Sequence, residues 1–579
     1  MTEDRSSDEG GYQEIYDRAL ERVSAQAPRW THREVSDPGI TFLETWALLA
    51  DMQNFYADRI GEEHYRKYLK LLGIARDEGE CAVARIFFDK VDRDCVLPKG
   101  TKFLAGNMVF EPEEEIRLCA NTLTGFYPEP DQNRIGTMRM RRKTSFALKE
   151  QTPLFALTLE KAVEQGRELD LFILLDEQKP RNPSGEDFRM AYLSWEYLSY
   201  GGWREAEIRE DETKGLLYSG RIRLYMREKM LSDGKGYGVR CRVREGAYDR
   251  MPVLYKIFLN VGKAVQRETL CDEEKFKMSR EQSAVALGSY LARTGEVAVF
   301  LGRGRGEWEE ITPECGIDPP ITAERLERHV RLPARLLSGE NVSVKVVSSA
   351  RKALEEYRPC HITGVSSQQI TLPWTGIRYD RLRLMLRQRT GGNLYREYHL
   401  ADIESCGAYI WHRLESREGI VLGDGRHGVI PNEAHDGLLL TSLVLSGGAE
   451  GNVAINKIKE WEQPELFGDI TLRNLLAGCG GRDAKKPSQQ FAAAGEMLSR
   501  PNRLVTEEDI LFLAKETPGL LIEEVKAYRK NGTVVVEIVP MEPLQSAYCR
   551  EKYRKAVADH LEPYRIMGSR LAVVIAGED

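Results

Sequence analysis

The sequence contains one glycine pattern that could bind a nucleotide. Gly423, Gly425 and Gly428 spell G-x-G-x-x-G directly after the apolar run 420–422. In dinucleotide-binding proteins this pattern opens a helix whose N-terminal amides hold the pyrophosphate. Here "VIPN" follows at once, and Pro431 cannot continue a helix because it lacks an amide hydrogen. We therefore expect the glycines to shape a β-turn, and a nucleotide-binding enzyme is kept only as an alternative.

Other catalytic or metal-binding patterns are absent from the sequence. The nine histidines are dispersed without an H-E-x-x-H motif, and neither G-x-S-x-G nor a G-K-[ST] loop occurs. Cys360 and His361 are adjacent, but adjacency along the chain does not make the spatial dyad that a thiol nucleophile needs. The ten cysteines include no C-x-x-C pair, which favours reduced thiols in a cytosol. We predict no catalytic residue, no cofactor and no metal, and thus a protein that is not an enzyme.

Arginines alternate with apolar residues on three predicted strands. "RIRLYMR", "GVRCRVRE" and "RLRLMLRQR" place them on the outer side of half-buried antiparallel strands (Arg221, Arg223, Arg240, Arg242, Arg244, Arg381, Arg383 and Arg387). Such a sheet could bind a phosphate backbone, but these strands lack the interleaved aromatic residues that single-stranded nucleic acid needs. A solvated face with acidic residues on neighbouring strands is the better interpretation, so we predict no nucleic-acid partner.

Length and composition indicate a large, multi-domain chain. Its 579 residues predict roughly three to five domains, and the net charge of -7 neither demands nor excludes an anionic partner. The polar, acidic start "MTEDRSSDEGGYQE" lacks the order of a secretory signal peptide. The predicted helix at 42–60 is interrupted by six polar or charged residues, so it should not span a membrane. We expect no signal peptide, no membrane insertion and assembly in the cytoplasm.

The start of that helix carries several local signals. Asp37, Pro38 and Gly39 predict a turn, because proline fixes one backbone angle and glycine permits a positive one. Thr41 then reads as the N-cap residue. Glu44, three residues later, could bond back to the backbone N–H of Thr41 and complete a capping box.

The helix that follows is apolar over most of its circumference. Its large apolar residues occur at mixed helical spacings and include Phe42, Leu43, Trp46, Leu49 and Tyr56. Because a helix of a lone domain normally exposes one polar side, this helix is either central to a core or docked against other chains, and its sequence alone leaves both open. A second helix at 62–72, with Tyr65 and Leu69 on one face, completes a predicted helical hairpin.

We predict an α+β, multi-domain fold with an N-terminal helical hairpin, several antiparallel β modules and a small C-terminal α+β sandwich. From about Glu80, short runs with alternating burial replace the helical pattern. The expected divisions are a helical region at 1–78, a first β module at 79–150, a Trp-bearing β module at 151–280, an inserted module without an assigned type at 281–375, a β module with the glycine-rich turn at 376–475, a linker or arm at 476–503, and a C-terminal α+β domain at 504–579.

The C-terminal domain has the clearest local signals. Thr506 with Asp509 predicts the start of a helix at 507–516. Asn531 and Gly532 predict the turn of a β-hairpin. A helix from Ser546 and a final strand, "SRLAVVIAG", complete the order α-β-β-α-β.

Several segments in order along the chain resemble one protein family. The opening "APRWTHREVSDPGITFLETWALLADMQNFYADRI" with "YRKYLKLLGI" is similar to the N-terminal signature of the phage baseplate J-like family, in its branch of baseplate assembly proteins of contractile injection systems. Further similar segments are "VLPKGTKFLAGNMVFEPEEE", the stretch around "LSYGGWREAEIRE", "GIVLGDGRHGVIP", "SGGAEGNVA", "GGRDAKKPSQ" and "RLVTEEDILFLAKETPG". The segment 281–371 has no counterpart in this resemblance.

This resemblance implies a structural role. Such proteins are wedge subunits of contractile baseplates, repeated in a sixfold ring around a hub and spike, and their N-terminal helices join those of companion wedge proteins in a bundle. The resemblance also implies contact with a lysozyme-like sheath adaptor and a ring rearrangement coupled to sheath contraction. The expected oligomer is a homo- or hetero-oligomer within a phage-tail-like particle. On this interpretation the apolar helix is an interface and Trp46 is its first residue to test.

A carbohydrate-binding tail module is a further alternative. Trp195 and Trp203 lie in the predicted Trp-bearing β module, and exposed tryptophans can stack on sugars. Buried aromatic residues are the commoner use of tryptophan in β sandwiches. We therefore rank this function after the structural one.

Overall fold

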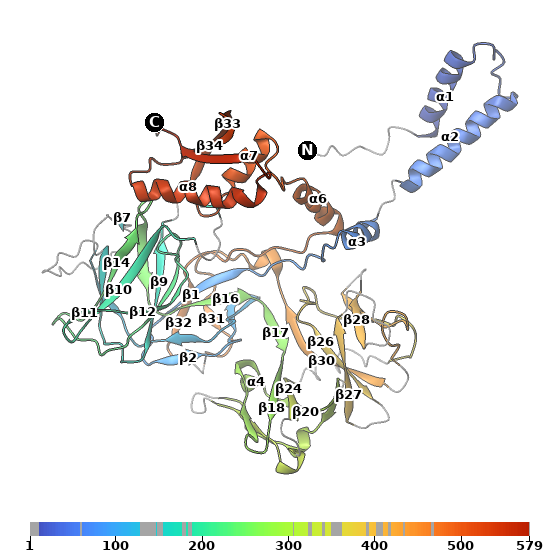
Figure 1. Ribbon diagram of the computed structural model, residues 1–579. Helices are drawn as coiled ribbons and strands as arrows, with labels where there is room; N and C mark the ends of the chain where they lie inside the picture. The colour runs from blue at the N-terminus through green and yellow to red at the C-terminus, as the bar shows by residue number, and fades with distance from the viewer. Residues whose placement is uncertain are drawn as a thin grey trace. The chain divides into compact units, whose positions relative to one another are not determined.

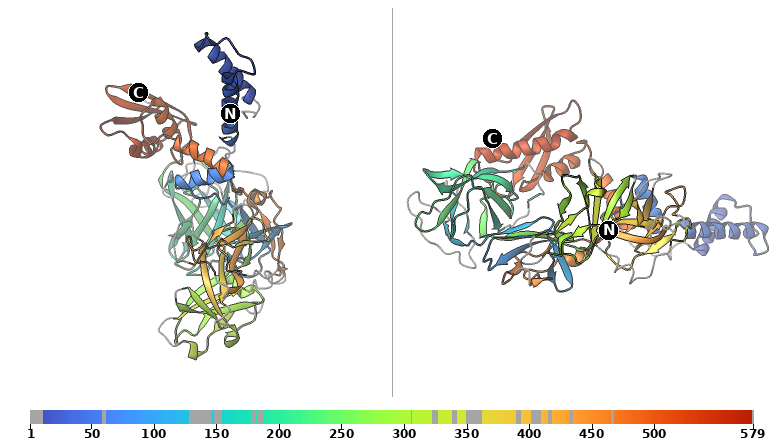
Figure 2. Two further views of the ribbon diagram at one scale, coloured as in Figure 1. Left: turned by 90° about the vertical axis from the view of Figure 1, so that its right-hand side faces the viewer. Right: turned by 90° about the horizontal axis from the view of Figure 1, so that it is seen from below.

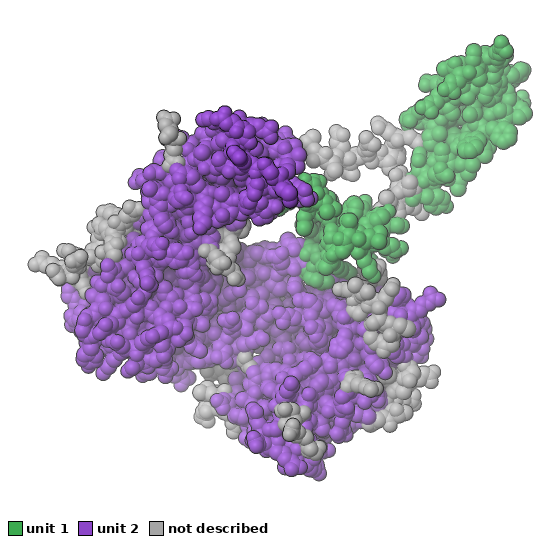
Figure 3. Space-filling model, viewed as in Figure 1, with its two compact units in different colours: residues 1–78, 484–500 green, residues 79–483, 501–579 purple. Residues whose placement is uncertain are grey.

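The computed structural model confirms an α+β chain with N-terminal helices and many antiparallel sheets (Figure 1). It describes residues 11–57, 61–127, 146–147, 154–176, 181–182, 188–304, 306–321, 327–337, 342–348, 362–388, 393–400, 409–414, 418–431, 435–464 and 468–577. The chain forms two compact units: residues 1–78 with 484–500, and residues 79–483 with 501–579 (Figure 3). Each unit is thus built from two separate stretches of sequence.

The first unit consists of helices that pair in twos. Its helices are α1 (Tyr12–Gln26), α2 (Pro38–Ala57), α3 (Glu62–Leu71) and α6 (Pro487–Leu498). The predicted N-terminal hairpin exists, but α1 and α2 form it, and α3 packs against α6 instead. The prediction that helices 41–60 and 62–72 pair was therefore wrong; residues 58–60 lie outside the described residues. The polar segment 12–26 also has apolar residues at helical spacing. The sequence prediction did not include this helix, because the apolar pattern of α2 is much stronger.

The second unit begins with a six-stranded sheet drawn from three distant parts of the chain. Its order is β31-β3-β4-β16-β1-β32. The strands are β1 (Val83–Asp89), β3 (Phe103–Ala105), β4 (Met108–Glu111), β16 (Val261–Gln266), β31 (Glu460–Trp461) and β32 (Thr471–Asn474), and β2 (Cys95–Leu97) pairs with β5 (Ile116–Leu118) beside them. The intervening residues form two further β structures inserted into this sheet.

The first insertion is a pair of five-stranded sheets that share one core. One sheet has the order β11-β10-β14-β8-β6 and the other β12-β13-β9-β15-β7. Their strands are β6 (Leu123–Tyr127), β7 (Phe146–Ala147), β8 (Phe155–Leu159), β9 (Glu168–Leu175), β10 (Ala191–Ser199), β11 (Gly202–Glu205), β12 (Glu207–Asp211), β13 (Gly220–Tyr225), β14 (Tyr237–Gly246) and β15 (Val253–Phe258). Trp195 is buried in this core, and the guanidinium of Arg240 lies 4.2 Å from the ring centroid of Trp203. Trp195 is therefore not accessible to a sugar, and Arg240 covers one face of the Trp203 ring.

The second insertion is an eleven-stranded sheet with a small satellite sheet. Its main path is β17-β30-β26-β27-β21-β20-β24-β18, with β25, β28 and β29 attached, and the satellite is β19-β23-β22. The strands are β17 (Glu268–Cys271), β18 (Glu273–Met278), β19 (Ala284–Ala286), β20 (Val297–Gly304), β21 (Glu307–Glu310), β22 (Gly316–Ile317), β23 (His329–Arg331), β24 (Val342–Ser348), β25 (Gln369–Thr371), β26 (Arg383–Gln388), β27 (Leu394–Leu400), β28 (Ile410–Arg413), β29 (Gly419–Leu422) and β30 (His435–Leu445), and helix α4 spans Ser289–Arg293. The segments expected as modules at 281–375 and 376–475 share this sheet.

The C-terminal module has the predicted order of elements. It contains α7 (Glu507–Lys515), β33 (Ile522–Lys530), β34 (Thr533–Pro540), α8 (Ala547–Leu561), a short 3-10 helix (Glu562–Tyr564) and β35 (Arg570–Ile575). Elsewhere in the second unit, short 3-10 helices occur at Thr312–Glu314, Ala334–Leu336 and Gly448–Gly451. The capping box of Thr506 with Asp509, the Ser546 cap and the hairpin turn at Asn531 and Gly532 are confirmed. β34 is central, antiparallel to β33 and parallel to β35.

This module packs on the five-stranded sheets through a continuous apolar core, and the two lie side by side in each view of Figures 1 and 2. A buried ion pair of the five-stranded sheets lies at the contact: the Arg181 guanidinium donates to both carboxylate oxygens of Asp249 at 2.6 and 2.7 Å, and across the contact to the Gly519 carbonyl at 3.2 Å. The Tyr553 hydroxyl of α8 donates to Asp249 at 2.7 Å and accepts the backbone N–H of Leu521 at 3.2 Å. Because these polar groups satisfy one another, the contact can be both buried and polar.

The segment expected as a linker or arm at 476–503 is more structured than we predicted. Cys479 and Arg482 form isolated β-bridges with Val83 and Glu80, and residues 487–498 form α6. The alanine-rich run "FAAAGEML" favours a helix, and Pro487 occupies the first helical turn, where its missing N–H costs nothing. The composition of glycine, alanine and charge therefore misled the linker prediction.

Candidate interaction surface

The residues before α2 fix where that helix begins. The backbone carbonyl of Asp37 accepts the first helical bond from Thr41 at 3.1 Å, and its side chain accepts the Gly39 N–H at 2.7 Å. Asp37 is therefore the N-cap and Pro38 the first helical residue, so the predicted turn at 37–39 and the Thr41–Glu44 capping box were wrong. Asp-Pro is itself a helix-start signal, and it places the N-cap four residues earlier than Thr41.

Trp30 holds this helix start from the loop between α1 and α2. Its indole N–H donates to Asp37 at 2.8 Å, and this bond together with the Gly39 amide lowers the pKa of the Asp37 carboxyl. A Cβ at Gly39 would come within 2.2 Å of the Trp30 ring, so glycine is needed for the close approach. Trp30, Asp37 and Gly39 thus form one local unit that connects α1 to α2.

One side of α2 faces α1 and is lined by small or partly buried residues. Ile40 and Ala47 are buried, and Leu43, Glu44 and Ala50 are half-buried. They recur at intervals of three and four residues, which is the spacing of a single helix face. The hairpin contact therefore uses a narrow stripe and leaves the larger side chains elsewhere on the helix.

The rest of α2 exposes seven large apolar side chains, which we call the α2 apolar face. They form two adjacent rows at helical spacing and are 45–69% exposed (Phe42, Trp46, Leu49 and Tyr56 in one row; Leu48, Met52 and Phe55 in the other). No basic residue lies between Pro38 and Ala57. Exposed apolar patches of this kind mark interaction surfaces. The predicted interface residues include the first row but not the second, although both rows follow the helical repeat.

The predicted interface residues of α3 do not join this face. Tyr65 lies against Phe491 of α6 with ring centroids 5.5 Å apart, and Leu69 is buried. Glu62 accepts the hydroxyl of Ser488 at 2.8 Å, and this bond is the largest cause of its lowered pKa. Tyr65 therefore contacts α6 within the chain, and a role of Tyr65 and Leu69 in a bundle with other chains stays a prediction.

The glycine pattern lies in a turn after β29. The Gly425 N–H donates to the Gly428 carbonyl at 2.9 Å, and both glycines have positive φ angles, 89° and 97°. The Asp424 carboxylate accepts the backbone N–H groups of Arg426 and His427, and these bonds with the His427 ring keep the pKa of Asp424 well below its ordinary value. The described residues up to 431 contain no following helix, so the turn lacks the amide array that a pyrophosphate needs.

The outer arginines of the five-stranded sheets have acidic neighbours, as predicted. Arg223 pairs with Asp170 at 3.0 Å and Arg240 with Glu196 at 2.6 Å, in both cases directly across neighbouring strands. Arg221 pairs with Glu210 at 2.9 Å. Since the carboxylates neutralise these guanidinium groups, the faces carry little free positive charge for a phosphate backbone.

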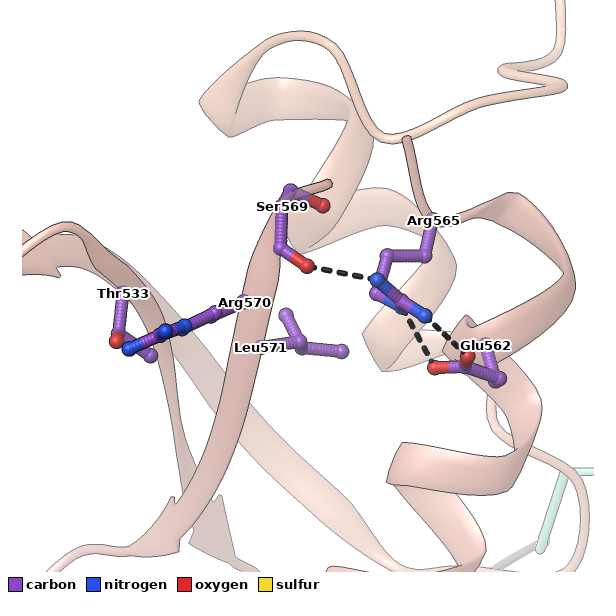
Figure 4. A pocket seen from close by; sticks show the side chains of 6 residues that line it. All are labelled: Thr533, Glu562, Arg565, Ser569, Arg570 and Leu571. Carbon is purple, nitrogen blue, oxygen red and sulfur yellow. Dashed lines mark hydrogen bonds and ion pairs between the residues drawn. The ribbon is translucent and has the colours of Figure 1, made fainter. Parts of the chain in front are cut away.

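Other kinds of site find little support. Within the ranges given above, no group of three or more His, Cys, Asp or Glu side chains is arranged to hold a metal ion, and no helix there is long and apolar enough to span a membrane. Cys360 and His361 lie outside the described residues. A shallow hollow in the C-terminal module is lined by Thr533, Glu562, Arg565, Ser569, Arg570 and Leu571, and Arg565 bonds to Glu562 within it (Figure 4).

Comparison with known proteins gives one match to a protein family. Residues 11–67 match the N-terminal domain of bacteriophage baseplate proteins. The matched segment contains α1 and α2 in full and the first part of α3. Comparison with the curated proteins gives no match. The N-terminal helical hairpin is therefore similar to that domain.

Two solved structures are similar over most of the chain. One is the type VI secretion system TssK-TssF-TssG baseplate subcomplex, with 10% identity, a TM-score of 0.31, and coverage of 92% of this chain and 96% of that chain. The other is the sixfold-symmetrised anti-feeding prophage baseplate, with 9% identity, a TM-score of 0.25, and coverage of 96% of this chain and 70% of that chain. TM-scores this low carry no argument about the fold.

Proposed function

We propose that this protein is a structural subunit of the baseplate of a contractile injection system and that the α2 apolar face binds helices of companion baseplate proteins. The exposure of this face on a hairpin that matches the baseplate N-terminal domain is the observation that carries the proposal. The face has the shape of a helix-in-groove or helix-bundle contact, in which anchors recur every three to four residues.

The described residues of the chain leave the side chains of the α2 apolar face largely exposed to solvent. Burying a Leu, Phe or Met side chain stabilises a protein by about 1.5–3 kcal/mol relative to leaving it in water. In the described structure that gain is only partly realised for the seven residues of the face, which stay 45–69% exposed. A companion helix would realise it, and large aromatic residues such as Trp46 are the usual anchors of such contacts.

The charged residues of α2 lie away from the α2 apolar face. Glu44 and Asp51 are both half-buried and belong to the side of α2 that faces α1. A companion helix is therefore selected by the match of its apolar face to the α2 apolar face.

The family resemblance suggests a more specific role within the baseplate. On this proposal the subunit is a wedge protein repeated in a sixfold ring around the hub and spike, next to a lysozyme-like sheath adaptor. A rearrangement of the ring would then be coupled to sheath contraction. A ring of this kind uses heterologous or paired contacts that close under rotation, so each subunit needs more than one interface.

Co-expression with a neighbouring-gene baseplate protein tests the helix contact. Trp46→Asp should prevent co-purification of the companion, because it places a charge in the centre of the apolar face. Tyr200→Asp is the matched control, since Tyr200 is an aromatic residue of similar exposure (65% against 69% for Trp46) in the second unit. Equal co-purification of the companion by both variants would refute the proposed contact.

A further inference from the structure

The C-terminal sheet has an edge strand that no described segment of the chain covers. β35 pairs with β34 alone, at the opposite end of the sheet from β33. Glycines flank the strand at Gly568 and Gly577, and a Cβ at either position would meet nothing within 4 Å. Both ends of β35 therefore lie in open space, and its outer N–H and C=O groups are available to a further strand.

The two edges of this sheet differ sharply in sequence. β33 reads "IEEVKAYRK" and carries five charged residues in nine, whereas β35 reads "RLAVVI" and has no charge from Leu571 to Ile575. Charged side chains on an edge strand normally prevent association with other sheets. β33 is protected in this way and β35 is not.

The loop that leads into β35 is also apolar and exposed. Met567 is 98% exposed and Ile566 is 39% exposed. The side chains of Leu571, Ala572, Val573 and Val574 are each partly exposed along the strand. The loop from Ile566 and the strand are therefore mostly apolar, and charged groups gather at the start of the strand, where Arg570 lies beside Thr533 and the Arg565 guanidinium donates to the Ser569 carbonyl (Figure 4).

We propose that β35 pairs antiparallel with β35 of a second copy of this chain, so that the two three-stranded sheets become one sheet of six strands. A two-fold axis perpendicular to the sheet keeps α7 and α8 of both copies on the same face. A register centred on Val573 places Leu571 opposite Ile575 and Ala572 opposite Val574. Every pair in the centre of the contact is then apolar.

Charge favours this antiparallel arrangement and a symmetrical partner. In that register the two Arg570 residues stand six positions apart, roughly 20 Å at 3.3 Å per residue. A parallel arrangement would place them side by side, which is unfavourable for like charges. An identical uncharged strand also brings no unpaired charge to the edge, whereas a strand like β33 would. This contact is independent of the α2 apolar face and would give the subunit a second interface.

Sedimentation velocity of the full-length Trp46→Asp variant tests the proposal, because this background removes association through α2. We expect a concentration-dependent monomer–dimer equilibrium. Val574→Lys, which places a charge near the two-fold axis, should raise the dissociation constant about tenfold or more. Tyr528→Lys adds the same charge to the outer side of the protected β33 edge and should leave the dissociation constant unchanged.

Hydrogen exchange gives a second measurement that does not depend on a variant. The amides of β35 should become more protected as the protein concentration rises, whereas those of β33 should not. A chain that stays monomeric up to its solubility limit would overturn the proposal. A dimer that Val574→Lys leaves intact would also overturn it, as would concentration-dependent protection confined to β33. Either of these two results would show that another surface carries the contact.

Discussion

The buried ion pair between Arg181 and Asp249 should be essential for holding the C-terminal module on the five-stranded sheets. The side chains are 8% and 2% exposed, and the carboxylate receives two bonds from the guanidinium and one from the Tyr553 hydroxyl. Burial by itself would lower the pKa of Arg181, but the bonds to Asp249 outweigh burial and raise it. Asp249→Ala therefore leaves a guanidinium ion buried, with the Gly519 carbonyl as its remaining described acceptor.

Removing one partner of a buried pair typically costs about 3–5 kcal/mol, because the other charge loses its compensation. Tyr553→Phe removes one bond to a charged group and leaves the Leu521 N–H without its acceptor, so it should cost less, about 1–3 kcal/mol. The expected order of destabilisation is Asp249→Ala, then Tyr553→Phe. Asp249→Asn should fall between wild type and Asp249→Ala, because the amide oxygen can still accept one bond.

Hydrogen–deuterium exchange can measure this destabilisation at individual amides. A local measurement is needed because a chain with more than one compact unit does not have a single free energy of unfolding. If the whole cost appears in the opening of α8 and β34, the protection of their amides should fall by roughly a hundredfold to a thousandfold or more in Asp249→Ala. Arg554→Ala, which breaks an exposed pair with Glu551, is the control and should change protection by less than about fivefold. Equal effects of the two variants would refute the reasoning that burial makes the Asp249 pair important.

Three further predictions concern stability. Burial would raise the pKa of Glu397, but the charges of Lys345 and Lys275 outweigh it and lower that pKa to about 2. The ionised carboxylate therefore stabilises the folded chain above the unfolded pKa of about 4.5, and this stability is lost as the pH falls toward 2. Glu397→Gln should destabilise the chain against urea at pH 7, and the difference from wild type should shrink below pH 4. Thr506→Ala removes the N-cap of α7 and should cost about 1 kcal/mol by amide exchange in that helix, whereas a loss no larger than experimental error would contradict the capping assignment. Gly39→Ala should displace the Trp30 ring and destabilise the hairpin of α1 and α2 by about 1–3 kcal/mol, seen as lost amide protection in α2; unchanged protection would mean that the loop adjusts without strain.

Local signals in the sequence predicted the C-terminal module well. Its helix caps, its Asn-Gly turn and the periods of its elements involve residues close together in the chain, so each signal could be read without knowing the fold. The apolar face of α2 was visible for the same reason, because helical spacing alone places Phe42, Trp46 and Leu49 on one side.

Long-range pairing could not be predicted in the same way. β1 lies between β16 and β32, strands about 175 and 390 residues later in the chain, and no local pattern specifies such partners. The pairing of α3 with α6 likewise depends on a helix more than 400 residues away. Tyr65 was expected to face other chains and contacts Phe491 of α6, because an apolar helix face shows only that something covers it.

The solvent accessibility of Trp46 in the free and assembled protein tests the central claim most directly. Hydroxyl-radical footprinting of the isolated chain should oxidise Trp46 rapidly, since its side chain is 69% exposed. In the complex with a companion baseplate protein, its oxidation rate should fall by tenfold or more, on the order expected for a buried anchor, while that of Tyr200 stays the same. A Trp46 that is oxidised equally fast in the free chain and the complex would contradict the proposal that α2 is the docking helix.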